Sequence, residues 1–127
     1  MVKSKQSIRN KADRLLQEYI RREHGTELCE LCGERQVSCG HHFIYKSQSL
    51  ALRYELENII PLCRDCHLYA HRWQNLFSAN ITAKRGEDWL CSIERLRREG
   101  LGVKFTKEWA ELKLKVLEQL LQTLKCQ

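Results

Sequence analysis

Two short cysteine pairs constrain the fold of this chain more than any other feature of its sequence. Two residues separate Cys29 from Cys32, and two separate Cys63 from Cys66. This gap lets both thiolates of a pair reach one ion, and two pairs complete the tetrahedral four-thiolate shell that structural zinc prefers. Buried or redox-active thiols are the alternative, but a redox site needs only one pair. The spacing therefore predicts a structural zinc ion, with Gly33 allowing the backbone to turn after the first pair.

The remaining composition indicates a globular protein in a reducing compartment. The chain has 127 residues, one proline, 43% hydrophobic and 30% charged residues, which suits a single domain spanning residues 1–127. No stretch is apolar for the length of a membrane span, and the N-terminus is polar where a signal peptide would turn apolar. Seven cysteines, an odd number, argue against a disulfide framework, so we expect a cytoplasmic location.

Three cysteines lie outside the two pairs. Cys39 could compete for the metal, although its spacing fits neither pair. Cys91 lies on an apolar helical face and is expected in the core, whereas Cys126 lies at a frayed end.

The charge balance favours a polyanionic partner without establishing one. The sequence has 22 Lys and Arg against 16 Asp and Glu, a formal charge of +6. Lysines and arginines bind phosphates with release of condensed counterions, but many basic proteins only carry solvated charges. Within the region of the cysteine pairs, the cations expected to contact phosphates are Lys46, Arg53, Arg64 and Arg72.

The segment between the cysteine pairs predicts strands followed by a helix. Residues 36–47 are expected to form a strand, a turn and a second strand, with Gly40 as the kink. Residues 50–63 are expected to form a loop or short helical turn, since Pro61 blocks a continuous helix. Residues 64–77 have the composition of one helix that buries Leu68, Trp73, Leu76 and Phe77.

Two histidines on the helix predicted over residues 64–77 share one face. His67 and His71 are four residues apart, so both rings could reach a single ion, and a solvated histidine pair is the alternative.

The flanking segments predict helices. Residues 3–24 have an apolar face on a basic helix, residues 86–100 suggest a helix closed by Gly100, and Thr106 suits the N-cap of a final helix. The apolar stripe of that last helix comprises Trp109, Leu112, Val116, Leu117, Leu120, Leu121 and Leu124. Its leucine-rich end could form a homodimer, or serve as an adaptor surface for another protein.

The order of residues resembles a known family. His41-His42, then Asn58, then Cys63-x-x-Cys66-His67 is similar to the HNH, or ββα-metal, endonucleases braced by a four-cysteine zinc. The stretch GHHFIYKSQSLALRYELENIIPLCRDCH resembles more narrowly the recombination endonucleases of lambdoid bacteriophages, the NinG or Rap group. In that group Asn follows the second cysteine pair, whereas this chain has His67 and His71, as in the His-rich sites of bacterial toxin nucleases. The resemblance covers about residues 25–105.

The resemblance implies an α+β fold and an activity. A zinc-braced ββα-metal core over residues 25–78 would be flanked by an N-terminal helix over 1–24 and a C-terminal helical region over 79–127. The protein would be a DNA endonuclease acting on branched recombination intermediates, such as Holliday junctions or D-loops, in a bacterial host's cytoplasm. A nonspecific or nicking DNase, and a noncatalytic zinc-dependent nucleic-acid-binding module, are the alternatives.

The same resemblance implies roles for the site residues. His42 would be the general base, with an ordinary pKa near 6.5 that suits proton abstraction, and Asn58 would hold the loop and fix the His42 ring by hydrogen bonding. His41 would point the other way along a strand and bind the catalytic ion together with His67 and His71. That ion is expected to be Mg²⁺ or Mn²⁺, although imidazole also suits other transition metals, and the zinc would be purely structural.

Overall fold

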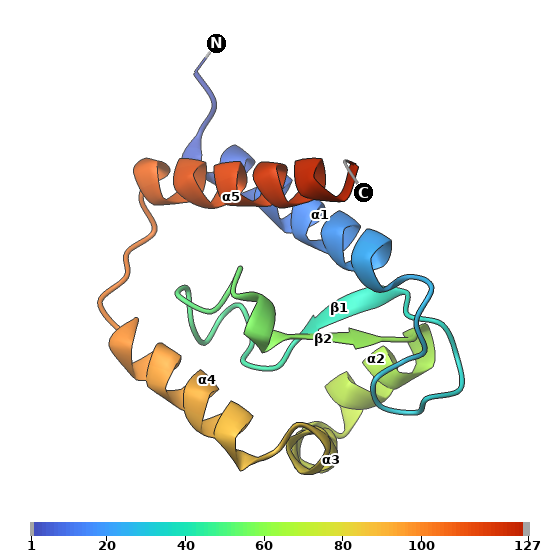
Figure 1. Ribbon diagram of the computed structural model, residues 1–127. Coiled ribbons are helices and arrows are strands. Elements are labelled where there is room, and N and C mark those ends of the chain that lie inside the picture. The colour runs from blue at the N-terminus through green and yellow to red at the C-terminus, as the bar shows by residue number, and fades with distance from the viewer. Residues whose placement is uncertain (1, 126–127) are drawn as a thin grey trace.

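The first long helix of the protein is explained by its sequence. We describe residues 2–125 from a computed structural model (Figure 1). Helix α1 (Lys5–His24) begins where the Ser4 side chain accepts a hydrogen bond from the Ser7 amide, and it contains neither Gly nor Pro. Its buried side chains recur every four residues, at Ile8, Ala12, Leu16 and Ile20. The predicted N-terminal helix is confirmed, starting two residues later than expected.

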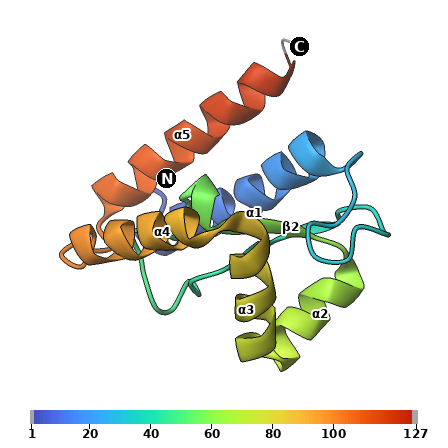
Figure 2. The same ribbon diagram turned by 60° about the horizontal axis from the view of Figure 1, so that its bottom comes forward.

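The other elements complete an α+β fold, as predicted. They follow in the order β1 (Cys39–His42), the 3₁₀ turn η1 (Leu56–Asn58), β2 (Ile59–Leu62), α2 (Arg64–Arg72), α3 (Gln74–Arg85), α4 (Glu87–Glu99) and α5 (Lys107–Lys125). The two-stranded sheet lies between α1 and α5 on one side and α2, α3 and α4 on the other (Figure 1). Helix α3 connects α2 to α4 and packs against both (Figure 2).

The sheet differs from the predicted hairpin. Strand β1 pairs in antiparallel fashion with β2, so its partner is residues 59–62 and not the residues that directly follow it. Pro61 lies opposite Gly40, and the backbone polar groups of both residues point away from the ladder: Gly40 bonds to Gln17, and the Pro61 carbonyl accepts from the Glu30 amide. The N–H that proline lacks is therefore not needed at this position.

The helix predicted over residues 64–77 is two helices. The chain breaks at Trp73, whose backbone angles are φ −122° and ψ 61°. Leu68, Trp73 and Leu76 were expected to be buried and are instead half or more exposed, whereas Phe77 is buried as expected. The reason is that α2 turns the face of Cys66 and Ala70 toward the core, which leaves Leu68 on the solvent side.

Strand β2 joins the two halves of the core, because successive side chains of a strand point to opposite sides. Ile60 and Leu62 pack with the paired cysteines, Ala70, Phe77 and Ile81. Ile59 packs with Val37, with Leu117 of α5, and with the buried row of α1. All four residues of β2 are buried, which places the strands of the site firmly between two helical layers.

The C-terminal helices begin and end largely as expected. Gly100 follows α4, and the Thr106 hydroxyl accepts a hydrogen bond from the Trp109 amide at the start of α5. Helix α5 packs along α1, with Leu117 in the same buried cluster as Ala12 and Leu16, whereas Leu112 and Val116 are exposed. A homodimer through this exposed side stays a prediction.

The cysteines outside the pairs have different surroundings. Cys91 is exposed and not in the core as expected, because α4 buries Ile93. Cys39 is half-buried, with its thiol 3.7 Å from the Leu62 carbonyl oxygen, and Cys126 lies outside the described residues. Within residues 2–125, no helix is long and apolar enough to cross a membrane.

Candidate metal centres and active site

The four paired cysteines converge in space. Their sulfur atoms all lie within 4.8 Å of one another. Gly33 has a positive φ of 66°, so the backbone turns directly after Cys32 as predicted. Cys63 is the N-cap of α2, where its sulfur accepts the Cys66 amide at 3.4 Å, and the Cys32 sulfur accepts the Glu34 amide at the same distance. Both pairs thus place their sulfurs by local backbone geometry.

The chemistry of this cluster fits zinc. A tetrahedral ion with Zn–S bonds of about 2.3 Å has sulfurs about 3.8 Å apart, and the sulfurs of Cys32 and Cys63 are 4.0 Å apart. The backbone amides of Glu34 and Arg35 lower the pKa of Cys32 to about 6, which favours the thiolate that binds metal. The cluster can therefore hold a zinc ion that joins the loop after α1 to the start of α2.

A second cluster comprises three histidines. His41 from β1 and His67 and His71 from α2 place one ring nitrogen each within 4.8 Å of the others, and the Nε2 atoms of His67 and His71 are 3.0 Å apart. Burial, with the nearby His67 and His71, lowers the pKa of His41 to about 3, and burial also lowers the pKa of His67. Three imidazoles with one ring nitrogen each this close together fit a divalent ion.

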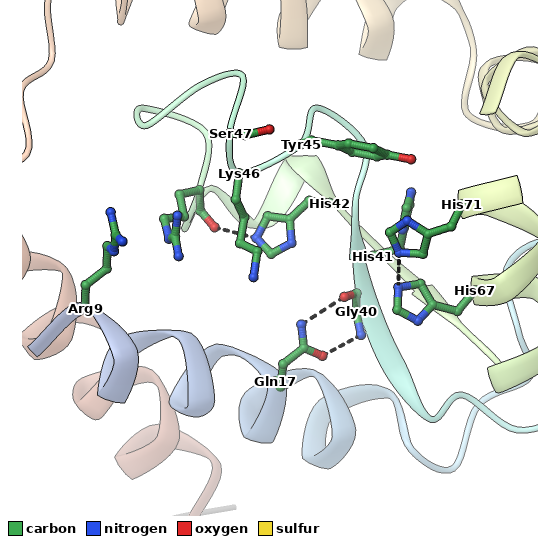
Figure 3. A pocket seen from close by; sticks show the side chains of 11 residues that line it. Arg9, Gln17, Gly40, His41, His42, Tyr45, Lys46, Ser47, His67 and His71 are labelled. Carbon is green, nitrogen blue, oxygen red and sulfur yellow. Dashed lines mark hydrogen bonds between the residues drawn. The ribbon is translucent and has the colours of Figure 1, made fainter. Parts of the chain in front are cut away.

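The His42 ring turns toward Arg53, whereas His41 faces α2 (Figure 3). The Nε2 atom of His42 is 2.8 Å from the Arg53 carbonyl oxygen. Since a carbonyl can only accept, Nε2 carries the proton and Nδ1 keeps the lone pair. Burial, with the nearby cations Lys46 and Arg53, lowers the pKa of His42 to about 4, below the expected 6.5. The ring is therefore neutral at physiological pH.

Asn58 holds the loop as expected, but its side chain makes no hydrogen bond to the His42 ring among the described residues. It is fully buried, and its amide oxygen accepts from the Ile44 amide at 2.8 Å. Its amide nitrogen donates to the carbonyls of Ile44 and Leu52, at 3.0 and 3.1 Å. The side chain thus closes the loop between β1 and β2 and does not bond to the His42 ring. The Arg53 carbonyl orients that ring instead.

The four cations expected to contact phosphates have separate environments. Arg53 is not free, because its guanidinium donates to both oxygens of Asp13, at 3.0 and 2.7 Å, and its side chain is only 11% exposed. Lys46 is exposed and lines the cavity described below. Arg64 and Arg72 are exposed on α2 outside that cavity, with Arg72 over the Trp73 ring.

One cavity of about 720 Å³ is shared by the three-histidine cluster and by His42 (Figure 3). All three histidines of the cluster line it together with His42, Lys46 and Ser47. Arg9 and Gln17 of α1 also line it, and neither was among the predicted site residues. The signal that could have found them is their spacing: Arg9, Asp13 and Gln17 recur every four residues beside the apolar row.

The comparisons with known proteins concern the same region. Residues 29–76 match the HNH endonuclease family, and neither a curated protein nor a solved structure matches the chain. The matched stretch contains both cysteine pairs, the paired histidines, Asn58 and two helical histidines. The narrower likeness to the NinG or Rap group stays a prediction. Residues 29–76, with their four-cysteine cluster, fit a zinc-binding HNH endonuclease domain.

Proposed function

We propose that the protein is a metal-dependent endonuclease that hydrolyses phosphodiester bonds in DNA. The observation that carries the proposal is the shared cavity, in which a neutral, oriented His42 lies beside three histidines able to hold a divalent ion. A noncatalytic zinc module would need the cysteine cluster but would place no demand on His41, His42, Asn58 or His67.

Each side chain then has a task in hydrolysis. An ion bound by His41, His67 and His71 would supply charge stabilisation at the scissile phosphate and the leaving oxygen. The free Nδ1 of His42 takes the proton of the attacking water, while Nε2 stays bonded to the Arg53 carbonyl. Asn58 keeps the intervening loop in place through Ile44 and Leu52. Mg²⁺ or Mn²⁺ is the ion we expect to support turnover.

The charge of the cavity suits a nucleic acid backbone. Arg9 and Lys46 line it, Arg53 lines it while paired with Asp13, and no Asp or Glu is among the lining residues in the described part of the chain. The Arg9 guanidinium lies over the Phe105 ring, 4.3 Å from its centroid, and its buried Nε has no hydrogen-bond partner among the described residues. We infer that Arg9 and Lys46 contact phosphates beside the scissile one. Arg64 and Arg72 would extend the contact along α2.

Neutralising either cation of the cavity should weaken DNA binding regardless of sequence. The measurement uses a His42→Ala background, which permits binding without cleavage. Arg9→Gln and Lys46→Gln should each reduce the slope of log affinity against log salt concentration by about 0.9, the change expected for the loss of one phosphate contact. Arg14→Gln is the matched control, because Arg14 is exposed on the same helix and does not line the cavity. Slopes equal to that of the control would show that the cavity cations do not contact phosphates.

Preference for branched DNA rests on the resemblance of residues 40–67 to recombination endonucleases. The experiment compares labelled Holliday junctions, D-loops, nicked duplexes and linear duplexes, each with Mg²⁺, Mn²⁺ or EDTA. We expect cleavage that needs the added ion and is fastest on one of the branched substrates. Equal rates on all substrates would favour a nonspecific DNase, and cuts in one strand only would favour a nicking enzyme.

A further inference from the structure

Helix α1 presents a second row of side chains beside its buried apolar row. Arg9, Asp13 and Gln17 are four residues apart and therefore lie along one face of the helix. Arg9 and Gln17 of this row line the histidine cavity (Figure 3). The helix lies outside residues 29–76, so the family match assigns no role to it.

Gln17 bonds to the free edge of β1 as a neighbouring strand would. Its amide nitrogen donates to the Gly40 carbonyl and its amide oxygen accepts from the Gly40 N–H, both at 2.9 Å. Gly40 directly precedes His41 and His42. A Cβ at Gly40 would collide with side chains of Ile59 and Ile20, so the close approach of strand and helix depends on this glycine. Gln17 thus fixes the strand that carries the two histidines.

Asp13 anchors the segment that meets His42 from the other side. Its two oxygens accept the bidentate pair from Arg53, and Oδ1 also accepts from the Tyr54 hydroxyl at 2.7 Å. Burial alone would raise the pKa of Asp13, but hydrogen bonds from Arg53 and Tyr54 and the charge of Arg53 bring it below its ordinary value. The carboxylate is therefore charged at neutral pH and binds residues 53–54 to α1.

The two anchors meet at His42. One hydrogen bond fixes the ring. It runs from Nε2 of His42, at the end of β1, to the carbonyl of Arg53, eleven residues further along the chain. The loop between them is tied by Asn58 at Ile44 and Leu52, and α1 supplies the ties at Gly40 and Arg53. We propose that Gln17 and Asp13 of α1 are positioning residues, which hold in register the two backbone segments between which the His42 ring is oriented.

This inference rests on the proposed function for its effect on turnover. Asp13→Asn and Gln17→Leu should lower kcat by about 10–100-fold, the range found when a hydrogen-bond partner that orients a metal ligand is lost. KM for DNA should stay unchanged, because the polar atoms of both side chains are engaged in hydrogen bonds within the protein. Asp13→Ala should lose more than Asp13→Asn, which keeps the shape and an accepting oxygen. Glu18→Gln is the matched control, because among the described residues this carboxylate on the same helix pairs only with exposed Arg22.

A readout independent of cleavage is the tautomer of His42. Long-range ¹H–¹⁵N spectra of the zinc-loaded protein should show His42 protonated only at Nε2, and a mixture of tautomers in Asp13→Asn and Gln17→Leu. Wild-type kcat in both variants, or lost activity with an unchanged His42 tautomer, would overturn the inference and leave α1 a purely structural helix. If Asp13→Ala fails to fold, Asp13→Asn carries the test. If the wild type cuts no DNA, the nuclease proposal fails, while the spectra still decide whether α1 orients the ring.

Discussion

His42→Ala is expected to lower kcat for DNA cleavage by about 10²–10⁴-fold, the usual contribution of general-base catalysis. The fold, the zinc content and the affinity for DNA should stay nearly unchanged, because the imidazole acts only as the attacking water loses its proton. The half-buried ring bonds to one carbonyl and belongs to neither metal cluster, so its removal leaves both clusters complete. Single-turnover cleavage of a labelled duplex at saturating protein measures the effect.

Two neighbouring variants distinguish the base from a ligand. His41→Ala should weaken binding of the catalytic ion, so that excess Mn²⁺ restores part of the activity. The activity of Asn58→Ala should lie between the activities of His42→Ala and His41→Ala. The substitution frees the loop and leaves backbone groups of Ile44 and Leu52 without a hydrogen-bond partner. Full activity in His42→Ala, with a loss in His41→Ala that metal does not restore, would exchange the two roles.

Cys63→Ser should unfold the region around the cysteine cluster. Structural zinc contributes on the order of 10–16 kcal/mol in small zinc-dependent modules, which is as large as the whole stability of a typical domain. Cys63 is buried, caps α2 and packs with Ile60 and Leu62, so the loss of metal also exposes core. We expect no zinc by metal analysis and no cooperative thermal transition.

The double variant His67→Ala, His71→Ala is the matched comparison for the cysteine substitution. It should keep one zinc per chain and the wild-type fold but lose the second ion, because His67 is only half-buried, His71 is exposed, and neither belongs to the hydrophobic core. Equal metal content in this variant and in wild type after identical loading would refute the second site.

The clusters were largely predictable because their geometry is local. A gap of two residues places both sulfurs of each pair, and four residues on a helix stack His67 over His71. The approach of His41 to α2 required the sheet as well, and the family resemblance indicated it. The helices α1, α4 and α5 followed from apolar periodicity and capping residues, whereas the family resemblance implied the α+β fold.

The strand pairing and the break in the long helix were not predictable in the same way. Strand β2 has four residues, follows a 3₁₀ turn and contains Pro61, which argues against a strand when read alone. Residues 59–62 form a strand because they are buried on both sides, and this burial is a property of the whole core. The break at Trp73 has no Gly or Pro signal, so one continuous helix was the simpler prediction.

The contacts that orient His42 join residues far apart in sequence. Arg53 meets Asp13 across 40 positions and Gln17 meets Gly40 across 23. A sequence shows that Arg53 is cationic but not that the carboxylate of Asp13 pairs with it, so its expected role at a phosphate stays a prediction. Polar residues on one face of α1 look solvated until the strand beside them is known.

Nicking of supercoiled plasmid by the zinc-loaded wild-type protein tests the nuclease proposal most directly. The assay compares added Mn²⁺ or Mg²⁺ with no added ion, in the presence of the zinc already bound at the cysteine cluster. We expect conversion to open-circular or linear DNA only with the added ion, and none by His42→Ala. An intact plasmid with every divalent ion tried, from protein that is folded and carries its zinc, would contradict the proposal and make the protein a noncatalytic zinc-binding module.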